Sequence, residues 1–156
     1  MGQILVCVSE EGIRTLLLGP EREPLVQELA DQVAPAKLSE DGEGLAAVLA
    51  TIDRYWHDPH AQIVLPLDPV GTTFQHQVWK ELERIPSGAT ISYGELARRL
   101  GQPRAARAVA KACGANPILL LIPCHRVVGS DGSLTGFRAG IEIKKWLLQK
   151  ESSILS

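Results

Sequence analysis

Residues 118–128 read ILLLIPCHRVV, and this stretch decides how the rest of the chain is interpreted. A short apolar run that ends at a proline predicts a fully buried strand, because proline cannot donate to a strand ladder. Cys124 would then stand at the end of a rigid strand, with His125 beside it. A reactive thiol needs a fixed position and a nearby base or cation that supports its thiolate. The stretch therefore predicts a nucleophilic cysteine.

A structural role is the alternative for Cys124, because free cysteine is usually buried and behaves as a small hydrophobe. Cys7 lies in an alternating apolar segment and Cys113 near the end of an alanine-rich one, so both are expected to be structural. Cys124 differs from them because proline, histidine and arginine surround it. These polar neighbours favour the reactive interpretation.

Length and cysteine content exclude several classes of protein. A chain of 156 residues is long enough to bury a core and predicts one or two small domains. Its three cysteines form no CxxC pair, which argues against a disulfide framework and against a structural zinc site. No apolar stretch reaches the length of a membrane span. We expect a protein of the reducing cytoplasm, with no metal and no membrane partner.

Charge is divided unevenly along the chain. Residues 1–70 contain twelve Asp and Glu against four Lys and Arg, a net charge of −8. Residues 71–156 contain six against twelve, a net charge of +6. Such a division is either ordinary variation on solvated surfaces or the mark of a C-terminal half that faces a polyanion. The positions of the basic residues decide between the two.

The apolar pattern predicts an α+β fold in two parts. Residues 1–70 are expected to form a small structural α+β domain, and residues 71–156 a mostly helical domain with a winged-helix-like helix-turn-helix. The first domain is expected to contain a hairpin of strands over 4–8 and 13–18, helices over 24–33 and 45–56, and a strand over 63–67.

Two capping boxes mark helix starts in the second part. They lie at residues 72–75 and 92–95, and the second helix is expected to stop at Gly101. A further helix is expected over 103–114. Two helices joined by a turn that contains glycine are typical of a helix-turn-helix.

The last of these helices is rich in alanine, with Arg104, Arg107 and Lys111 among the alanines. Readout of sequence in the major groove needs several side chains that reach base edges, which alanines cannot do. Small side chains do allow close approach to a phosphate backbone, and the basic residues would contact it. The composition favours DNA binding by shape and charge over an alanine-rich core helix with incidental arginines.

Six segments together carry a family resemblance: Pro123–Val128, Ile91–Tyr93, Ala105–Val109, Asn116–Pro117, Gly136–Phe137 and Lys145–Leu148. They resemble the O6-alkylguanine-DNA alkyltransferases (methylated-DNA–protein-cysteine methyltransferases), most of all the C-terminal domain of the bacterial adaptive-response protein. The resemblance covers essentially the whole chain. It implies irreversible, single-turnover transfer of an alkyl group from O6 of guanine in double-stranded DNA to a cysteine, after the nucleotide has been turned out of the helix; O4-alkylthymine is a second implied substrate. It also implies a monomer without a cofactor.

The resemblance implies catalytic roles for five residues. Cys124 would accept the alkyl group, and His125 would act as its base through a water. Glu151 would orient His125 and stabilise its charged form. Asn116 would tie the helix-turn-helix to the active-site segment, and Tyr93 would help to turn the nucleotide out.

Contacts to DNA and to the extruded base are implied in the same way. Arg107 would enter the base stack in place of the lost base. Further DNA contacts would come from Ala106, Ser92, Lys111 and Ser130. The pocket for the base would be lined by Val127, Phe137, Arg138 and Ala139, where the small side chain of Ala139 would leave room for groups larger than methyl.

Three other functions compete with alkyl transfer. Lesion-binding modules without transfer activity are similar to this family but carry tryptophan at the acceptor position, so Cys124 argues against that class. A helix-turn-helix regulator is disfavoured because the reading helix has few side chains that distinguish bases. A thiol hydrolase would explain neither the Ala/Arg helix nor the division of charge.

Overall fold

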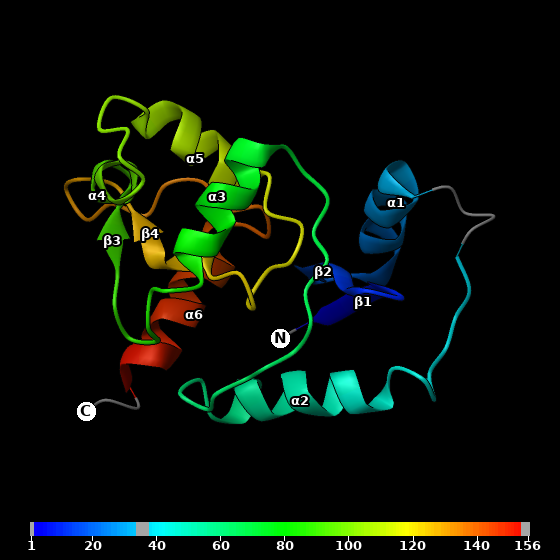
Figure 1. The fold of residues 1–156 in the computed structure, drawn as a ribbon. Helices are drawn as coiled ribbons and strands as arrows, with labels where there is room; N and C mark the ends of the chain where they lie inside the picture. Colours follow the sequence, from blue (N-terminus) through cyan, green and yellow to red (C-terminus); the bar gives the residue numbers. More distant parts are fainter. Residues whose placement is uncertain (1, 34–37, 154–156) are drawn as a thin grey trace.

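The computed structural model describes residues 2–33 and 38–153 (Figure 1). In this part of the chain, helices make up most of the regular structure, and there are two small sheets of two strands each. The predicted α+β class is confirmed. The predicted division into two domains at residue 70 stays a prediction.

An antiparallel hairpin and two helices precede residue 58. β1 (Gln3–Ser9) pairs with β2 (Gly12–Gly19), as the alternating pattern predicted. β2 is buried along almost its whole length, and α1 (Arg22–Gln32) packs against it. α2 (Ala46–His57) buries Ile52 on its inner face. Both predicted helices are therefore confirmed, with bounds that differ by one or two residues.

The strand predicted over residues 63–67 is not formed. In the described part of the chain this segment makes one isolated bridge, between Leu67 and Ile13, with Ile13 N donating to Pro66 O at 2.9 Å. Pro66 has no N–H, and Val64 is 89% exposed, so the segment lacks the donors and the burial of a core strand. Gly12 allows the close approach, because a Cβ at its φ of +148° would lie 2.5 Å from Pro66 O.

Three helices form the part predicted as a helix-turn-helix and its support: α3 (Thr73–Leu82), α4 (Tyr93–Arg99) and α5 (Ala106–Gly114). Thr72 caps the N-terminus of α3 and forms, with Gln75, the complete capping box that the sequence predicted. Gly101, with φ +73°, ends α4 and turns the chain toward α5 (Figure 1). α5 begins at Ala106 and not at Pro103, because Ala105 N bonds to Gln102 O in a separate turn before the helix.

Only half of the capping box predicted at residues 92–95 is formed. Ser92 Oγ accepts from Glu95 N at 3.0 Å. The reciprocal bond from Ser92 N is not made among the described residues, because the Glu95 carboxylate pairs with Arg98 and Arg99 in the next turn. The cap at Ser92 therefore starts α4 by itself.

The apolar run 118–122 is a buried turn, and the strand predicted there is wrong. Ile118 makes a single bridge to Leu16 of β2. The chain then reverses at Leu120, whose φ of +71° lies in the left-handed region. Asn116 draws the two ends of the run together, because its side chain bonds to Ile118 N at 2.9 Å and to Ile122 O at 2.7 Å.

The run leads into the 3-10 helix η2 (Cys124–Arg126), so Cys124 begins a helical turn instead of ending a strand. β4 (Val127–Val128) follows and pairs in parallel with β3 (Ile91–Ser92). α6 (Ile141–Ser153) then packs against η2. The residues around Cys124 are therefore held between the helix-turn-helix and α6.

One apolar cluster joins the two halves of the chain. Leu16 of β2 and Trp79 of α3 both belong to it. Trp79 donates its indole N–H to Ala112 O at 2.9 Å, which fixes α3 to α5. Trp56 stacks on Trp146 with 4.6 Å between ring centroids, which fixes α2 to α6. Over residues 2–33 and 38–153, no helix has the length and apolarity needed to cross a membrane.

Candidate active site

Asn116 holds the predicted acceptor cysteine in place. Its buried side chain donates to Cys124 Sγ at 3.2 Å with the same Nδ2 group that bonds to Ile122 O. Asn116 lies two residues after α5, at the junction where the sequence predicted a link to the active-site segment. Cys124 is 5% exposed, so the thiol is fixed in a nearly closed position.

Glu151 of α6 gathers three side chains behind the thiol. Its Oε1 accepts from Tyr55 Oη at 2.7 Å and lies 2.7 Å from His125 Nε2. Arg126 reaches both carboxylate oxygens through Nε and Nη2, at 2.9 to 3.2 Å. Glu151 is 1% exposed and His125 is 0% exposed, so water is excluded from the pair. The structure thus brings together two of the predicted residues, and it adds Tyr55 and Arg126.

This network sets the protonation of His125. Burial favours the neutral acid of Glu151, but the hydrogen bonds from His125 and Arg126 and the positive charge of Arg126 outweigh it and hold the Glu151 pKa well below its usual range. A carboxylate can only accept, so His125 Nε2 carries the hydrogen. Burial lowers the pKa of His125 although Glu151 opposes the shift, so the ring is neutral.

The other ring nitrogen of His125 is therefore a proton acceptor. Nδ1 is buried and has no hydrogen-bond partner among the described residues. Cys124 and His125 are adjacent on η2, and no direct hydrogen bond joins their side chains among the described residues. A base separated from its thiol in this way can take the proton through a bridging water.

The thiol itself needs such a base. Burial raises the pKa of Cys124, so the resting group is a protonated thiol. The hydrogen bond from Asn116 and the positive charges of Lys144 and Arg138 oppose that rise. They favour the thiolate once the proton leaves.

Lys144 is a buried charged residue near Cys124 that sequence reasoning missed. It is 0% exposed, and its Nζ donates to Thr135 O at 2.9 Å. Burial lowers the pKa of Lys144, while the thiolates of Cys124 and Cys113 would raise it. Its spacing from Leu147 and Glu151 on α6, three and seven residues, is the signal that would have placed it on the buried face.

A cavity of about 400 Å³ opens beside Cys124. Phe137 and Arg138, two of the predicted pocket residues, are in its wall. Val127 and Ala139 are not in its lining: Val127 is buried in β4 and Ala139 packs against the core, and their part in the pocket for the base stays a prediction. The full lining is Tyr93, Ala110, Cys113, Gly114, Cys124, Thr135, Gly136, Phe137 and Arg138.

Two further lining residues bear on the chemistry of the cavity. Tyr93 donates to Thr135 O at 3.4 Å, which places the predicted flipping residue at the wall. Cys113 was expected to be structural, yet it faces the same space as Cys124. Burial raises the pKa of Cys113 to about 12, so this second thiol stays protonated. Among the described residues, no cluster of His, Cys, Asp and Glu could hold a metal ion.

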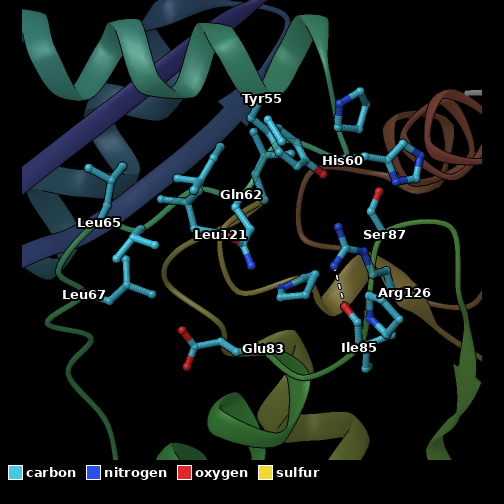
Figure 2. A pocket seen from close by; sticks show the side chains of 17 residues that line it. Tyr55, His60, Gln62, Leu65, Leu67, Glu83, Ile85, Ser87, Leu121 and Arg126 are labelled. Atoms are coloured by element: carbon cyan, nitrogen blue, oxygen red, sulfur yellow. Dashed lines mark hydrogen bonds between the residues drawn. The ribbon is translucent and has the colours of Figure 1, made fainter.

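A larger cavity of about 570 Å³ lies against Arg126 (Figure 2). Figure 2 shows Tyr55, His60 and Ser87 around the guanidinium, which donates to Ile85 O at 2.6 Å. Cys124 is absent from this lining. The segment 120–126 lies between the two cavities: Leu120, Leu121, Pro123 and Arg126 line the larger one, whereas Cys124 lines the smaller one. The larger cavity is therefore not the place where a group could meet the thiol.

The residues predicted to contact DNA lie on α5, at the start of α4 and after β4. Arg107 and Lys111 are exposed, and neither has an ion-pair partner in the part of the chain that the structure describes. On α4, in contrast, Arg98 and Arg99 are both paired with Glu95. The remaining predicted contacts are Ala106 at the first position of α5, Ser92 at the N-cap of α4 and the exposed Ser130.

Residues 73–153 match the family model "6-O-methylguanine DNA methyltransferase, DNA binding domain". The methylated-DNA–protein-cysteine methyltransferase of Methanosarcina barkeri is 40% identical over 99% of this chain and 94% of its own. The crystal structure of Mycobacterium tuberculosis OGT in complex with DNA superposes with a TM-score of 0.81 at 34% identity, covering 98% of this chain and 91% of that one.

Two longer relatives match over the same region. The bifunctional transcriptional activator/DNA repair enzyme Ada of Escherichia coli and the regulatory protein ada of Salmonella typhimurium are each 43% identical over 97% of this chain. The chain spans only 43% of the length of either relative. The Methanosarcina relative, which is covered over 94% of its length, and the family model matched by residues 73–153 nonetheless indicate the same family. The chain belongs to the 6-O-methylguanine DNA methyltransferase family.

Proposed function

We propose that this protein repairs O6-alkylguanine in double-stranded DNA by taking the alkyl group onto Cys124, once per molecule. One observation carries the proposal: Cys124 is fixed by Asn116 at the wall of a 400 Å³ cavity, next to a neutral histidine that is backed by Glu151. Membership of the family and the DNA complex of the Mycobacterium tuberculosis relative support DNA as the substrate. O4-alkylthymine is a second candidate substrate. A reduced thiol is needed, so we place the protein in the cytoplasm.

The transfer is a single displacement. A water relays the thiol proton of Cys124 to Nδ1 of His125 as Sγ attacks the alkyl carbon. The bond between that carbon and O6 breaks, and its electron pair stays on the guanine. The imidazolium then gives up its proton through water and the guanine anion takes one up, so the hydrogen lost by the thiol ends on the base. Glu151 stabilises the imidazolium in between.

The acceptor is consumed in this reaction. The product is a thioether, which neither hydrolyses nor leaves readily, and none of the residues around Cys124 offers a route back to the thiol. The protein is therefore expected to react once and then stay alkylated. One molecule would remove one lesion.

DNA must be opened before the thiol can react. A guanine in a duplex cannot reach a buried thiol, and turning the nucleotide out costs roughly a few kcal/mol. Arg107 is exposed on α5 without an ion-pair partner among the described residues, so it is placed to fill the gap in the stack. Lys111 would contact phosphate. The small side chain of Ala106 lets α5 approach the backbone, where Ser92 and Ser130 add hydrogen bonds.

Inside the cavity, the walls would hold the extruded base. Phe137 offers an aromatic ring to the base. Tyr93 lines the same cavity, and its hydroxyl donates to Thr135 O. Arg138 adds a positive charge where the guanine leaves with its electron pair. Val127 is buried directly after η2, where it supports the segment that carries Cys124.

Labelled duplex tests the acceptor. After incubation with DNA that contains O6-methylguanine with a labelled methyl carbon, the label is expected in the peptide that contains Cys124. Cys124→Ser should take no label, while Cys113→Ser, which changes the other thiol of the same cavity, should still take it. Label on a folded Cys124→Ser variant, or its loss from a folded Cys113→Ser variant, would overturn the assignment.

A further inference from the structure

Arg138 joins the pocket wall to a helix at the other end of the sequence. Its Nε donates to the Glu28 carboxylate of α1, 110 residues away along the chain. Its Nη1 donates to Asn116 O at 3.1 Å. Asn116 in turn donates through its side chain to Cys124 Sγ. A continuous path of hydrogen bonds therefore runs from α1 to the acceptor sulfur.

The wall that carries Arg138 has little regular structure of its own. Residues 129–140 contain no helix or strand in the described chain, and Gly136 and Gly140 bound the Arg138 turn with φ values of +40° and +101°. One backbone hydrogen bond, from Gly140 N to Phe137 O, closes that turn. Such a segment is positioned by side-chain contacts to its neighbours, because it has no ladder to hold it.

We propose that Glu28 is a positioning residue for alkyl transfer, which holds the Arg138 guanidinium against the Asn116 carbonyl and so fixes the pocket wall beside Cys124. The inference rests on the function proposed above and adds to it a part for α1, a helix in the half of the chain that carries no reactive group. Glu28 touches neither the thiol nor the cavity. It acts only through Arg138.

Charge gives the ion pair a second effect. The positive charge of Arg138 favours the Cys124 thiolate. With its orientation fixed by two acceptors, the guanidinium stays near the sulfur and near the space where the guanine anion leaves. Without Glu28, the guanidinium can swing toward solvent, and both effects weaken.

Loss of the pair should leave the fold intact. The side chains of Arg138 and Glu28 are 25% and 34% exposed, and ion pairs at such positions contribute little to folding. A substitution at Glu28 can therefore be measured in a folded protein. Glu23, an exposed residue of the same helix without an ion-pair partner among the described residues, gives a matched control.

Glu28→Gln and Glu23→Gln remove the same charge from α1. The rate of alkyl transfer from free O6-benzylguanine and from a methylated duplex should fall about fivefold in Glu28→Gln, the order of effect found for residues coupled in one network. Glu23→Gln should match the unmodified protein. DNA affinity and the denaturation midpoint should be unchanged in both variants.

A double-mutant cycle tests whether the effect passes through Arg138. In an Arg138→Gln background, Glu28→Gln should produce no further loss of rate. Equal losses in both backgrounds would overturn the positioning role. So would a Glu28→Gln variant with an unchanged rate, or one in which rate and denaturation midpoint fall together.

The rate of Cys124 alkylation by iodoacetamide between pH 6 and pH 10 separates this inference from the proposed function. Glu28→Gln should shift the profile toward higher pH, because the thiolate loses a fixed positive neighbour. If the unmodified protein takes no alkyl group from either substrate, the proposed function is wrong, and the transfer role of Glu28 is wrong with it. If transfer occurs but neither rate nor profile changes, only the role of Glu28 is wrong.

Discussion

At the scale of single residues, Glu151 organises the chemistry. It accepts hydrogen bonds from Tyr55, His125 and Arg126, and it is almost fully buried. A buried carboxylate without partners would be protonated, so the three donors are what keep Glu151 charged. That charge fixes the hydrogen of His125 on Nε2 and leaves Nδ1 as the proton acceptor that the proposed transfer needs.

The pH dependence of transfer follows from two pKa shifts. The pKa of His125 is lowered from 6.5, and that of the Cys124 thiol is raised from 9.0. Neutral His125 is lost only below its lowered pKa, so the rate with O6-benzylguanine should stay flat as the pH falls from 9 through 6.5. In His125→Ala, which has no base, the rate should instead climb with pH toward the pKa of the thiol. A steady climb in the unmodified protein would show that His125 does not take the proton.

Tyr55 offers a test of the network by stability. Tyr55→Phe removes one donor to Glu151 and should lower the free energy of unfolding by about 1 kcal/mol, the usual net value of a buried hydrogen bond. Tyr93→Phe makes the same chemical change at a weaker bond of 3.4 Å to a backbone carbonyl, and should cost less. Urea unfolding of both variants gives the comparison. Equal losses would mean that the bond from Tyr55 adds nothing particular to the site.

At the scale of elements, α4 and α5 both carry basic side chains, but only those of α4 form ion pairs among the described residues. The two arginines at the end of α4 share an ion pair with Glu95, whereas Arg107 and Lys111 on α5 have no ion-pair partner among the described residues. Unpaired cations on a helix with small neighbours can bind phosphate without first breaking an ion pair. α5 is therefore the element expected to contact DNA.

Substitutions at Arg107 and Lys111 should affect different steps, the first the repair rate and the second DNA binding. Arg107→Ala should slow repair of a methylated duplex at least about fivefold, in line with a loss of roughly 1–3 kcal/mol for a lost stacking contact, with little change toward free O6-benzylguanine. Lys111→Ala should weaken duplex binding and reduce its salt dependence by about one unit of slope. Stopped-flow rates on both substrates and binding at several salt concentrations check this. Equal slowing on both substrates in Arg107→Ala would mean a damaged pocket.

The elements that the sequence predicted are those defined by local signals. The Thr72 capping box and Gly101 act within a few residues, and the helix bounds around them were close. The run 118–122 was misassigned because Asn116, which closes it into a turn, competes with strand pairing through its side chain. The burial of Lys144 was not predicted, because lysine side chains usually reach solvent even from an apolar helix face.

At the scale of the whole molecule, the site is assembled from parts that lie far apart in sequence. Glu28 of α1, Tyr55 of α2 and Glu151 of α6 all connect to the segment 116–126. The stacked rings of Trp56 and Trp146 hold α2 against α6, which keeps Tyr55 within reach of Glu151. The acidic N-terminal half thus supports the site without supplying the nucleophile.

Acid should unfold the protein through this same site. The folded His125 has a pKa below 6.5, so the unfolded state binds a proton first and stability falls as the pH drops below 6.5. The pKa of Glu151 is lowered from 4.5, so its contribution is present above 4.5 and is lost below it. Between its folded and its unfolded pKa, each group should lower the free energy of unfolding by about 1.4 kcal/mol for each unit by which the pH falls.

Unfolding free energies from pH 7.5 to pH 3.5 check this dependence. In His125→Gln, the loss of stability that begins near pH 6.5 should disappear. His57→Gln, at an exposed position at the end of α2, should still show that loss. A decline that begins only below 4.5 in the unmodified protein would show that His125 is not held neutral by the fold.

Intact mass after titration with O6-methylguanine duplex tests the central claim most directly. With lesion in excess, every molecule should gain the mass of one CH₂ group, and the number of lesions lost should equal the number of protein molecules. The unreacted fraction should fall in proportion to lesion added below equivalence. Removal of many lesions per protein molecule, or loss of the lesion without a gain of mass, would contradict transfer to Cys124.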